Sequence, residues 1–188
     1  MKTGKELYNQ MDFQTLIRQR CSCRSYRPKP VEKEKLEQCM EAARLAPSGC
    51  NSQAWRYYVV TEPETKKQFA DAVYQSGFNR FAEQAPVLIA ITEQIPAKVM
   101  RVVREKYGTQ AYVQIDIGLS LSQLILQATE LGLATCILGI FDEDAVHALI
   151  PIPEGEKLRL VLALGYPAEE DVPEKNRHPL TEICQFIE

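Results

Sequence analysis

The sequence lacks the short motifs that mark several common classes of enzyme. It has only two histidines and no serine or cysteine motif beside them, so a Ser-His-Asp triad is not expected. It has no G-x-G-x-x-G and no P-loop, which leaves a Rossmann or ATP site without support. Its six cysteines include no C-x-x-C pair, so the spacing favours reduced thiols over a zinc site or a disulfide framework.

A long uninterrupted apolar run is also missing. The most apolar long stretch, residues 112–133, contains charged residues such as Asp116 and Glu130, so we expect a buried helix and not a membrane span. The first residues, MKTGKELYNQMDFQ, lack the continuous apolar core of a signal peptide. These two absences predict a cytoplasmic protein with no membrane contact.

Charge of one sign is not in large excess. The formal net charge is −3 over 188 residues, which argues against broad binding to nucleic acid and suggests that local arginine clusters bind a small anion. The length suits one domain, residues 1–188, with enough chain to bury most of its apolar surface. There is no internal repeat, linker or low-complexity segment.

Hydrophobic patterning predicts a mixture of helices and strands. Helices are expected over residues 12–20, 31–45, 61–74, 96–107 and 110–131, with a further short helix from Asp142. Buried strands are expected over residues 55–60, 86–92, 135–140 and 158–166. Because helices and strands do not alternate regularly, an α+β domain is favoured over a doubly wound fold.

Local signals support some of these boundaries. Asp12 is suited to cap the first helix, and residues 61–64 (TEPE) have the spacing of a capping box. The helix over residues 110–131 is apolar around most of its circumference, so it needs protein on more than one side. In a domain of this size, part of that cover is expected to come from a second copy of the chain.

A basic segment lies near the start of the chain. In an extended backbone Arg20, Ser22 and Arg24 alternate and therefore project from one face. Two guanidinium groups and a hydroxyl can bind a phosphate and donate to the carbonyl oxygens of a ring. The alternative is a solvated basic turn.

A second candidate segment follows the helix over residues 31–45. The loop over residues 47–53 (PSGCNSQ) breaks the helix and exposes backbone groups, and Asn51 and Gln53 carry both donors and acceptors. That set matches the mixed edge of a pyrimidine-like ring. A plain polar connection between helix and strand is the alternative.

A third candidate segment lies late in the chain. Lys175 and Arg177 could hold a phosphate dianion together, and the alternative is an exposed turn.

Four segments, taken in order, resemble the FMN-dependent nitroreductase family. They are residues 18–26 (RQRCSCRSY), 46–55 (APSGCNSQAW) and 131–142 (LGLATCILGIFD), followed by 162–170 (LALGYPAEE) with 175–180 (KNRHPL). The resemblance covers about residues 12–183. It implies a nitroreductase-like fold, with a central mixed or antiparallel sheet flanked by helices, a long buried central helix and an intertwined homodimer.

The resemblance also implies the activity. Family members bind FMN at the homodimer interface and pass a hydride from NADH or NADPH through flavin N5 to a nitroaromatic, quinone or similar acceptor. Donor and acceptor share one flavin face, which predicts ping-pong kinetics. The chemistry takes place on the cofactor, so no catalytic side chain is expected.

The site residues carried over from the family form two groups. One subunit would supply the first group to phosphate, ribityl chain and ring: Arg20, Cys21, Ser22, Arg24, Asn79, Ile137, Leu138, Gly139, Lys175 and Arg177. The loop of the other subunit would supply the second group: Pro47, Ser48, Gly49, Asn51 and Gln53. A backbone N–H at Leu138 or Gly139 would lie near N5.

The chain departs from the family pattern at several positions. Ala54 replaces a usual proline and Ala134 a usual glycine, and Cys21, Cys23 and Cys50 are unusual in segments that contact flavin. Residues 94–110 leave little room for a long helical insertion. Two alternatives therefore stay open: a specialised flavin reaction such as dehalogenation or ring oxidation, and a flavin-binding redox sensor without turnover that uses Cys50.

Overall fold

A computed structural model describes residues 11–75, 77–169 and 171–188. The expectation that no signal peptide is present concerns residues 1–14, of which residues 1–10 lie outside the described residues. The centre of the fold is a four-stranded sheet of order β1-β2-β4-β3, comprising β1 (Trp55–Val60), β2 (Val87–Gln94), β4 (Glu156–Gly165) and β3 (Ala134–Leu138). All three strand pairs are antiparallel, which agrees with the expected mixed or antiparallel sheet flanked by helices.

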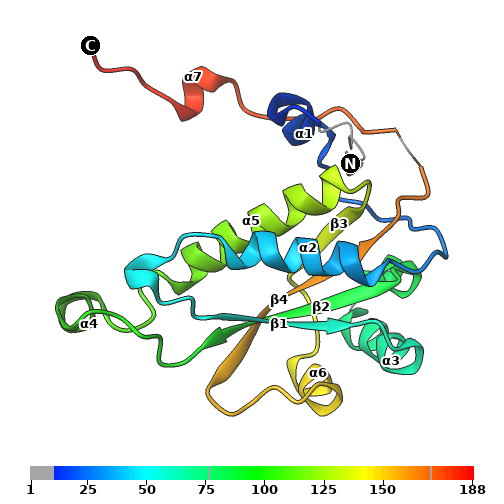
Figure 1. Ribbon diagram of the computed structural model, residues 1–188, viewed down its shortest axis with the longest axis horizontal. Helices are drawn as coiled ribbons and strands as arrows, with labels where there is room; N and C mark the ends of the chain where they lie inside the picture. The colour runs from blue at the N-terminus through cyan, green and yellow to red at the C-terminus, as the bar shows by residue number, and fades with distance from the viewer. Residues whose placement is uncertain (1–10, 76, 170) are drawn as a thin grey trace, which may run out of the picture.

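Helices cover both faces of this sheet (Figure 1). One face packs against α2 (Lys33–Arg44) and α5 (Val113–Glu130), and the other against α3 (Pro63–Val73), η2 (Arg80–Gln84) and α6 (Glu143–Leu149). Strand β2 is buried from Val87 to Glu93, and alternate residues face opposite sides: Ile89 packs toward α2 and α5, Leu88 toward α3 and α6. This double cover explains why the first five residues of β2, VLIAI, are all apolar.

Two helix starts follow the sequence and one does not. Asp12 caps α1 (Phe13–Gln19) and accepts the Thr15 N–H at 3.1 Å, as predicted, and Asp142 caps α6. Helix α3 is capped by Glu62, not by the first residue of the predicted capping box. The reason is Pro63, whose fixed φ suits the first helical position and makes the preceding residue the cap.

The predicted helix over residues 96–107 is shorter in the structure. Helix α4 covers only Arg101–Tyr107. The preceding residues are tied to other elements instead: the Ile95 N–H donates to the Gly155 carbonyl at 2.6 Å, and the Ala97 N–H donates to Gln110 Oε1 at 2.8 Å. The predicted strand over residues 135–140 likewise ends early, at Leu138.

Helix α5 is the longest of the described helices and is only partly covered by its own chain. Its 18 residues span about 27 Å. One side packs in the core, whereas Ile115 and Leu119 are 63% and 44% exposed. This uncovered apolar side agrees with the expectation that a second copy packs on α5.

The end of the chain runs away from the body as an extended arm that contains α7 (Leu180–Ile183) (Figure 1). Its large apolar side chains are strongly exposed: Leu180, Ile183, Phe186 and Ile187. Among the described residues, no helix combines the length and the apolar character that crossing a membrane requires.

Candidate functional site

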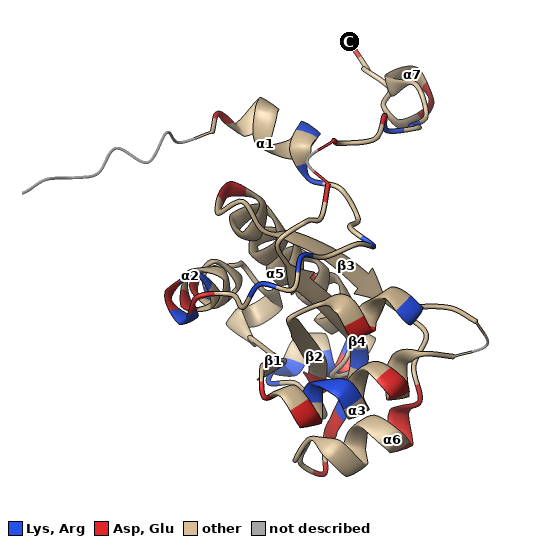
Figure 2. Ribbon diagram, turned by 90° about the vertical axis from the view of Figure 1, so that its right-hand side faces the viewer, with Lys and Arg blue, Asp and Glu red and all other residues tan. Residues whose placement is uncertain are grey.

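The first basic segment shows the predicted alternation at Ser22 and Arg24, whereas Arg20 is half-buried. Ser22 and Arg24 are exposed and Cys23 between them is buried, because the Cys23 N–H donates to the Thr135 carbonyl at 2.9 Å and holds the segment against β3. Arg20 ends α1 just before it. Basic positions follow the connection from α1 to α2 in Figure 2. The exposed side chains therefore lie beside the first residues of β3.

The late basic segment lies next to the early one (Figure 1). Lys175 Nζ donates a hydrogen bond to the backbone carbonyl of Arg18, 157 residues away in the chain. Arg177 is exposed, and its Nη1 donates to the Asn176 carbonyl at 2.7 Å. The fold thus gathers cations from both ends of the sequence at one end of α5.

The last residues of β3 and Gly139, which follows the strand, form a further predicted part of the site. Leu138 is buried, whereas Gly139 is exposed and a Cβ placed on it would meet no atom within 4 Å. Ile137 is 46% exposed. Asn79 Nδ2 donates to the Ile140 carbonyl at 2.9 Å, so Asn79 holds the chain just beyond Gly139. The predicted contacts at Asn79 and at residues 137–139 are therefore neighbours.

The loop over residues 47–53, which contains Asn51 and Gln53 and is called the amide-rich loop below, has an unusual backbone. It forms a 3-10 turn, η1 (Gly49–Asn51), and Cys50, Asn51 and Gln53 have positive φ values of 55°, 51° and 47°. Residues other than glycine rarely adopt positive φ values, and those that do are concentrated at functional sites. Internal bonds support the shape: the Gln53 N–H donates to Ser48 Oγ at 3.1 Å, and Gln53 Nε2 donates to Asn51 Oδ1 at 3.0 Å.

Within one chain the loop and the basic segments do not meet. The loop contacts the N-terminal turn of α5, whereas the basic segments lie beside β3, which follows the C-terminal end of α5. About 27 Å of helix separates these two ends. The two predicted groups of site residues can share a ligand only if a second copy supplies one of them.

Two residues that hold the loop were missed as site residues. The carboxylate of Asp116 accepts the Gly49 N–H, and the side chain of Tyr112 lies 3.1 Å from where a Cβ on Gly49 would stand. The available signal was an acidic residue inside an otherwise apolar helix. Its partner could not be read from sequence, because the contact joins residues 67 positions apart.

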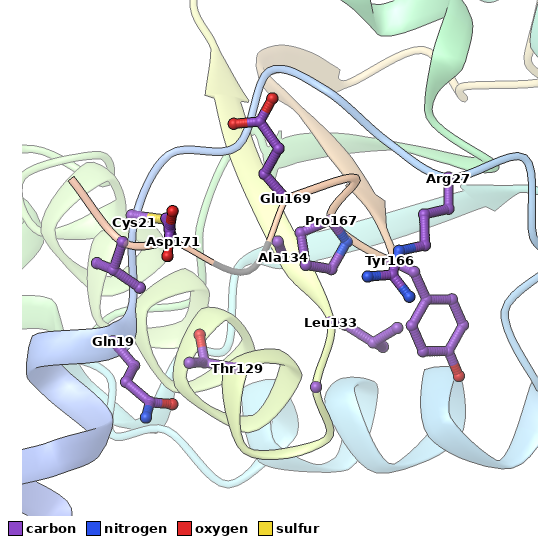
Figure 3. Close-up of a pocket in the computed structure, with 12 residues that line it drawn as sticks. Gln19, Cys21, Arg27, Thr129, Leu133, Ala134, Tyr166, Pro167, Glu169 and Asp171 are labelled. Carbon is purple, nitrogen blue, oxygen red and sulfur yellow. The ribbon is translucent and has the colours of Figure 1, made fainter.

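A cavity of about 410 Å³ is lined by residues of the first basic segment, of the connection from α5 to β3 and of the segment after β4 (Figure 3). Cys21, Arg27, Thr129, Tyr166 and Asp171 are among its lining residues. Of the predicted site residues only Cys21 lines it. The basic residues predicted for the site, Arg20, Arg24, Lys175 and Arg177, therefore do not line this cavity, whereas Arg27 does.

The thiols near the site differ in their environment. Burial raises the pKa of Cys23 and of Cys136 above the ordinary thiol value. Cys21 and Cys50 are partly exposed. In the described part of the chain, no three histidine, cysteine or acidic side chains group in a way that could hold a metal ion.

The donor set fits a ligand with a phosphate and a polar ring. Three guanidinium groups, an ammonium group and the Ser22 hydroxyl come from the two adjoining basic segments. Open space at Gly139 lets a flat ring approach the backbone. FMN has both parts, so the residues present are compatible with it.

Comparison with known proteins decides the family. The model of the nitroreductase family matches residues 17–166. The chain belongs to the nitroreductase family. This nitroreductase-family chain is 30% identical to a Thermus thermophilus protein named NADH dehydrogenase, covering 92% of this chain and 95% of the relative. It is 26% identical to an iodotyrosine deiodinase of Nematostella vectensis, covering 92% of this chain and 74% of the relative.

Solved structures of the family share the fold. A nitroreductase family protein of Clostridium difficile is 31% identical with a TM-score of 0.78, covering 94% of this chain and 98% of the other. A protein of Exiguobacterium sibiricum, solved in complex with FMN, is 24% identical with a TM-score of 0.80, again covering 94% and 98%. The expected nitroreductase-like fold is confirmed.

Proposed function

We propose that this nitroreductase-family protein is an FMN-dependent oxidoreductase that takes electrons from NADH or NADPH and passes them to a nitroaromatic, a quinone or a similar electrophile. It would act as a cytoplasmic homodimer with FMN at the subunit interface. When bound, FMN would supply the hydride chemistry, with donor and acceptor reacting in turn. The relative named NADH dehydrogenase and the FMN-bound family structure support this proposal.

The observation that carries the proposal is the convergence of the two basic segments. Lys175 contacts the backbone of α1 at Arg18, which puts Arg177 and Arg20 in neighbouring segments. Charge-assisted hydrogen bonds to a phosphate contribute about 1.5–3 kcal/mol each, so four cations are enough for tight retention. These cations would hold the phosphate end of FMN.

The other residues would orient the ring. Ser22 would donate its hydroxyl hydrogen to a carbonyl oxygen, and the exposed backbone at Gly139 would face the ring without a side chain between them. Asn79 holds the adjoining carbonyl of Ile140, which keeps this backbone in place. The proposed role of these residues is to position the cofactor, and no side-chain acid or base is needed.

The homodimer would bring the loop to the cofactor. In a two-fold symmetric dimer, a contact made by one copy is repeated by the other. The loop around Asn51 would then reach the basic segments of the partner, which it does not reach in its own chain. The exposed side of α5, with Ile115 and Leu119, is proposed to form part of the interface.

The test is spectroscopic. The purified protein is examined for flavin absorbance, then mixed anaerobically with NADH and, separately, with NADPH. We expect either donor to bleach the flavin absorbance and a nitroaromatic or a quinone to restore it. Steady-state rates should give parallel lines in double-reciprocal plots, as ping-pong kinetics require. Protein that neither contains FMN nor binds added FMN would refute the proposal.

A second candidate is reductive dehalogenation of an aromatic ring. The iodotyrosine deiodinase relative favours it, since the match extends over most of this chain. Flavin that stays oxidised with NADH and NADPH, but supports loss of halide from a halogenated phenol after chemical reduction, would favour this reaction. The outcome would leave FMN binding in place and change only donor and acceptor. Oxidation of a ring is the remaining specialised reaction.

The redox-sensor alternative rests on Cys50, which lies in the strained part of the loop. A sensor would need this thiol for its response. Flavin reduction and turnover that are the same in Cys50→Ala and in the unmodified protein would count against a sensor.

A further inference from the structure

Asp116 connects the long helix to the amide-rich loop. It lies in the first turn of α5 and is 4% exposed. Its two carboxylate oxygens lie 3.0 and 3.1 Å from the Gly49 nitrogen, whose N–H donates to them, and the Ser52 hydroxyl lies 3.5 Å from Oδ2. Both groups that contact the Asp116 side chain, the Gly49 N–H and the Ser52 hydroxyl, therefore belong to the loop.

A buried carboxylate is costly unless it is well partnered. An acidic residue near a helix N-terminus also gains from the helix dipole, and that would be reason enough for an aspartate on a solvent-facing side. Asp116 instead faces inward and reaches across to a different element. Its placement is therefore better explained by what it does to the loop.

The loop needs an anchor because its backbone is unfavourable. Cys50, Asn51 and Gln53 have positive φ values, and such conformations persist only where surrounding contacts enforce them. Asp116 holds the residue before this stretch, at Gly49, and faces Ser52 within it. The two contacts bracket Cys50 and Asn51, so they set the direction in which the Asn51 side chain leaves the loop.

The side chain of Tyr112 packs closely against Gly49, next to the contact of Gly49 with Asp116. A Cβ on Gly49 would lie 3.1 Å from the Cβ and ring of Tyr112, so only glycine lets the Gly49 N–H come this near to α5 without displacing that ring. The approach of Gly49 and the carboxylate of Asp116 thus belong to one arrangement.

We propose that Asp116 is a positioning residue of the FMN site, acting through the loop that presents Asn51. The inference rests on the proposed function and goes beyond it, because Asp116 would touch neither FMN nor the electron acceptor. In the dimer its effect would be felt at the cofactor held by the cations of the other subunit. One side of α5 would therefore serve the loop while Ile115, on its uncovered side, faces the partner.

The test is a double-mutant cycle on FMN binding, measured by equilibrium dialysis of the full-length protein. Asp116→Asn keeps the size of the side chain and removes its charge, and should raise the FMN Kd about tenfold, the loss expected for one weakened charge-assisted hydrogen bond. In an Asn51→Ala background the same change should raise it less than about twofold. In an Arg177→Ala background, Asp116→Asn should again raise the FMN Kd about tenfold.

This pattern separates positioning from general damage to the fold. A merely structural role would lower thermal stability and weaken FMN equally in both backgrounds, and that result would overturn the proposal. Asp144→Asn makes the same chemical change at an exposed position of α6 and should leave the Kd unaltered. If Asp116→Asn does not fold, Ser52→Ala removes the second contact from the loop side and should show the same dependence on Asn51.

Failure of the inference is distinct from failure of the proposed function. Unmodified protein that binds FMN, together with an Asp116→Asn variant that binds it equally well, would overturn the positioning role alone. Unmodified protein that binds no FMN would overturn the proposed function and the inference with it.

Discussion

Lys175 donates a hydrogen bond to the backbone carbonyl of Arg18, and this contact joins the two ends of the described chain. It brings the segment of Arg177 beside the segment that begins at Arg20. Two short basic stretches, each unremarkable as a surface turn, thereby become one surface with several cations.

Removal of cations from both segments should empty the site without unfolding the protein. Arg20→Ala combined with Arg177→Ala removes two charge-assisted contacts, each about 1.5–3 kcal/mol, so FMN affinity should fall at least about a hundredfold. Flavin content after purification and circular dichroism measure the two effects. Lys67→Ala with Lys157→Ala removes two exposed charges elsewhere and serves as the control. A double arginine variant that is isolated fully yellow would contradict the phosphate assignment.

The loop should act on the cofactor of the other subunit. A heterodimer of one Asn51→Ala chain and one Arg177→Ala chain would then contain one intact site and one doubly damaged site. Differently tagged chains are coexpressed and the heterodimer is purified; its FMN content should be about half that of the unmodified dimer. If loop and cations served the same chain's site, both sites would be damaged and the heterodimer would retain no more FMN than the two variant homodimers.

The C-terminal arm should stabilise the dimer. Ile183, Phe186 and Ile187 are 71%, 78% and 92% exposed in the single chain, and burial of one large apolar side chain contributes about 1.5–3 kcal/mol. Deletion of residues 180–188 should therefore weaken dimerisation at least about tenfold, measured by sedimentation equilibrium. Thr181→Ala with Gln185→Ala changes only polar positions of the arm and should have little effect. Equal dimer affinity after the deletion would exclude this role.

Three of the six thiols should be slow to react in the native protein. Cys23, Cys39 and Cys136 are buried, and burial raises the pKa of each, that of Cys39 to about 12. The thiolate is the reactive form, and a raised pKa keeps the thiol protonated, so these three should lag between about pH 7 and 9. A thiol-reactive dye should label at most three cysteines quickly and all six after denaturation. Rapid labelling of more than three would contradict this assignment.

The physical difference between local and distant interactions explains which parts of the fold could be predicted. The strand over residues 55–60 and the cap at Asp12 depend on neighbouring residues, and both were confirmed. The predicted start of α4 was wrong, because Ile95 and Ala97 form hydrogen bonds with Gly155 and Gln110. The hydrophobic periodicity of a segment does not reveal bonds to residues outside it.

The sequence by itself determined the family, the α+β class and the residue types able to bind a phosphate and a ring, because these depend on ordered short motifs and local periodicity. Only the tertiary structure decided which of these residues meet. It put Lys175 against α1, left the loop at the far end of α5 and paired Asp116 with Gly49. Such contacts arise when elements distant in sequence pack together. The free energy of that packing depends on residues of several segments, so no single segment predicts it.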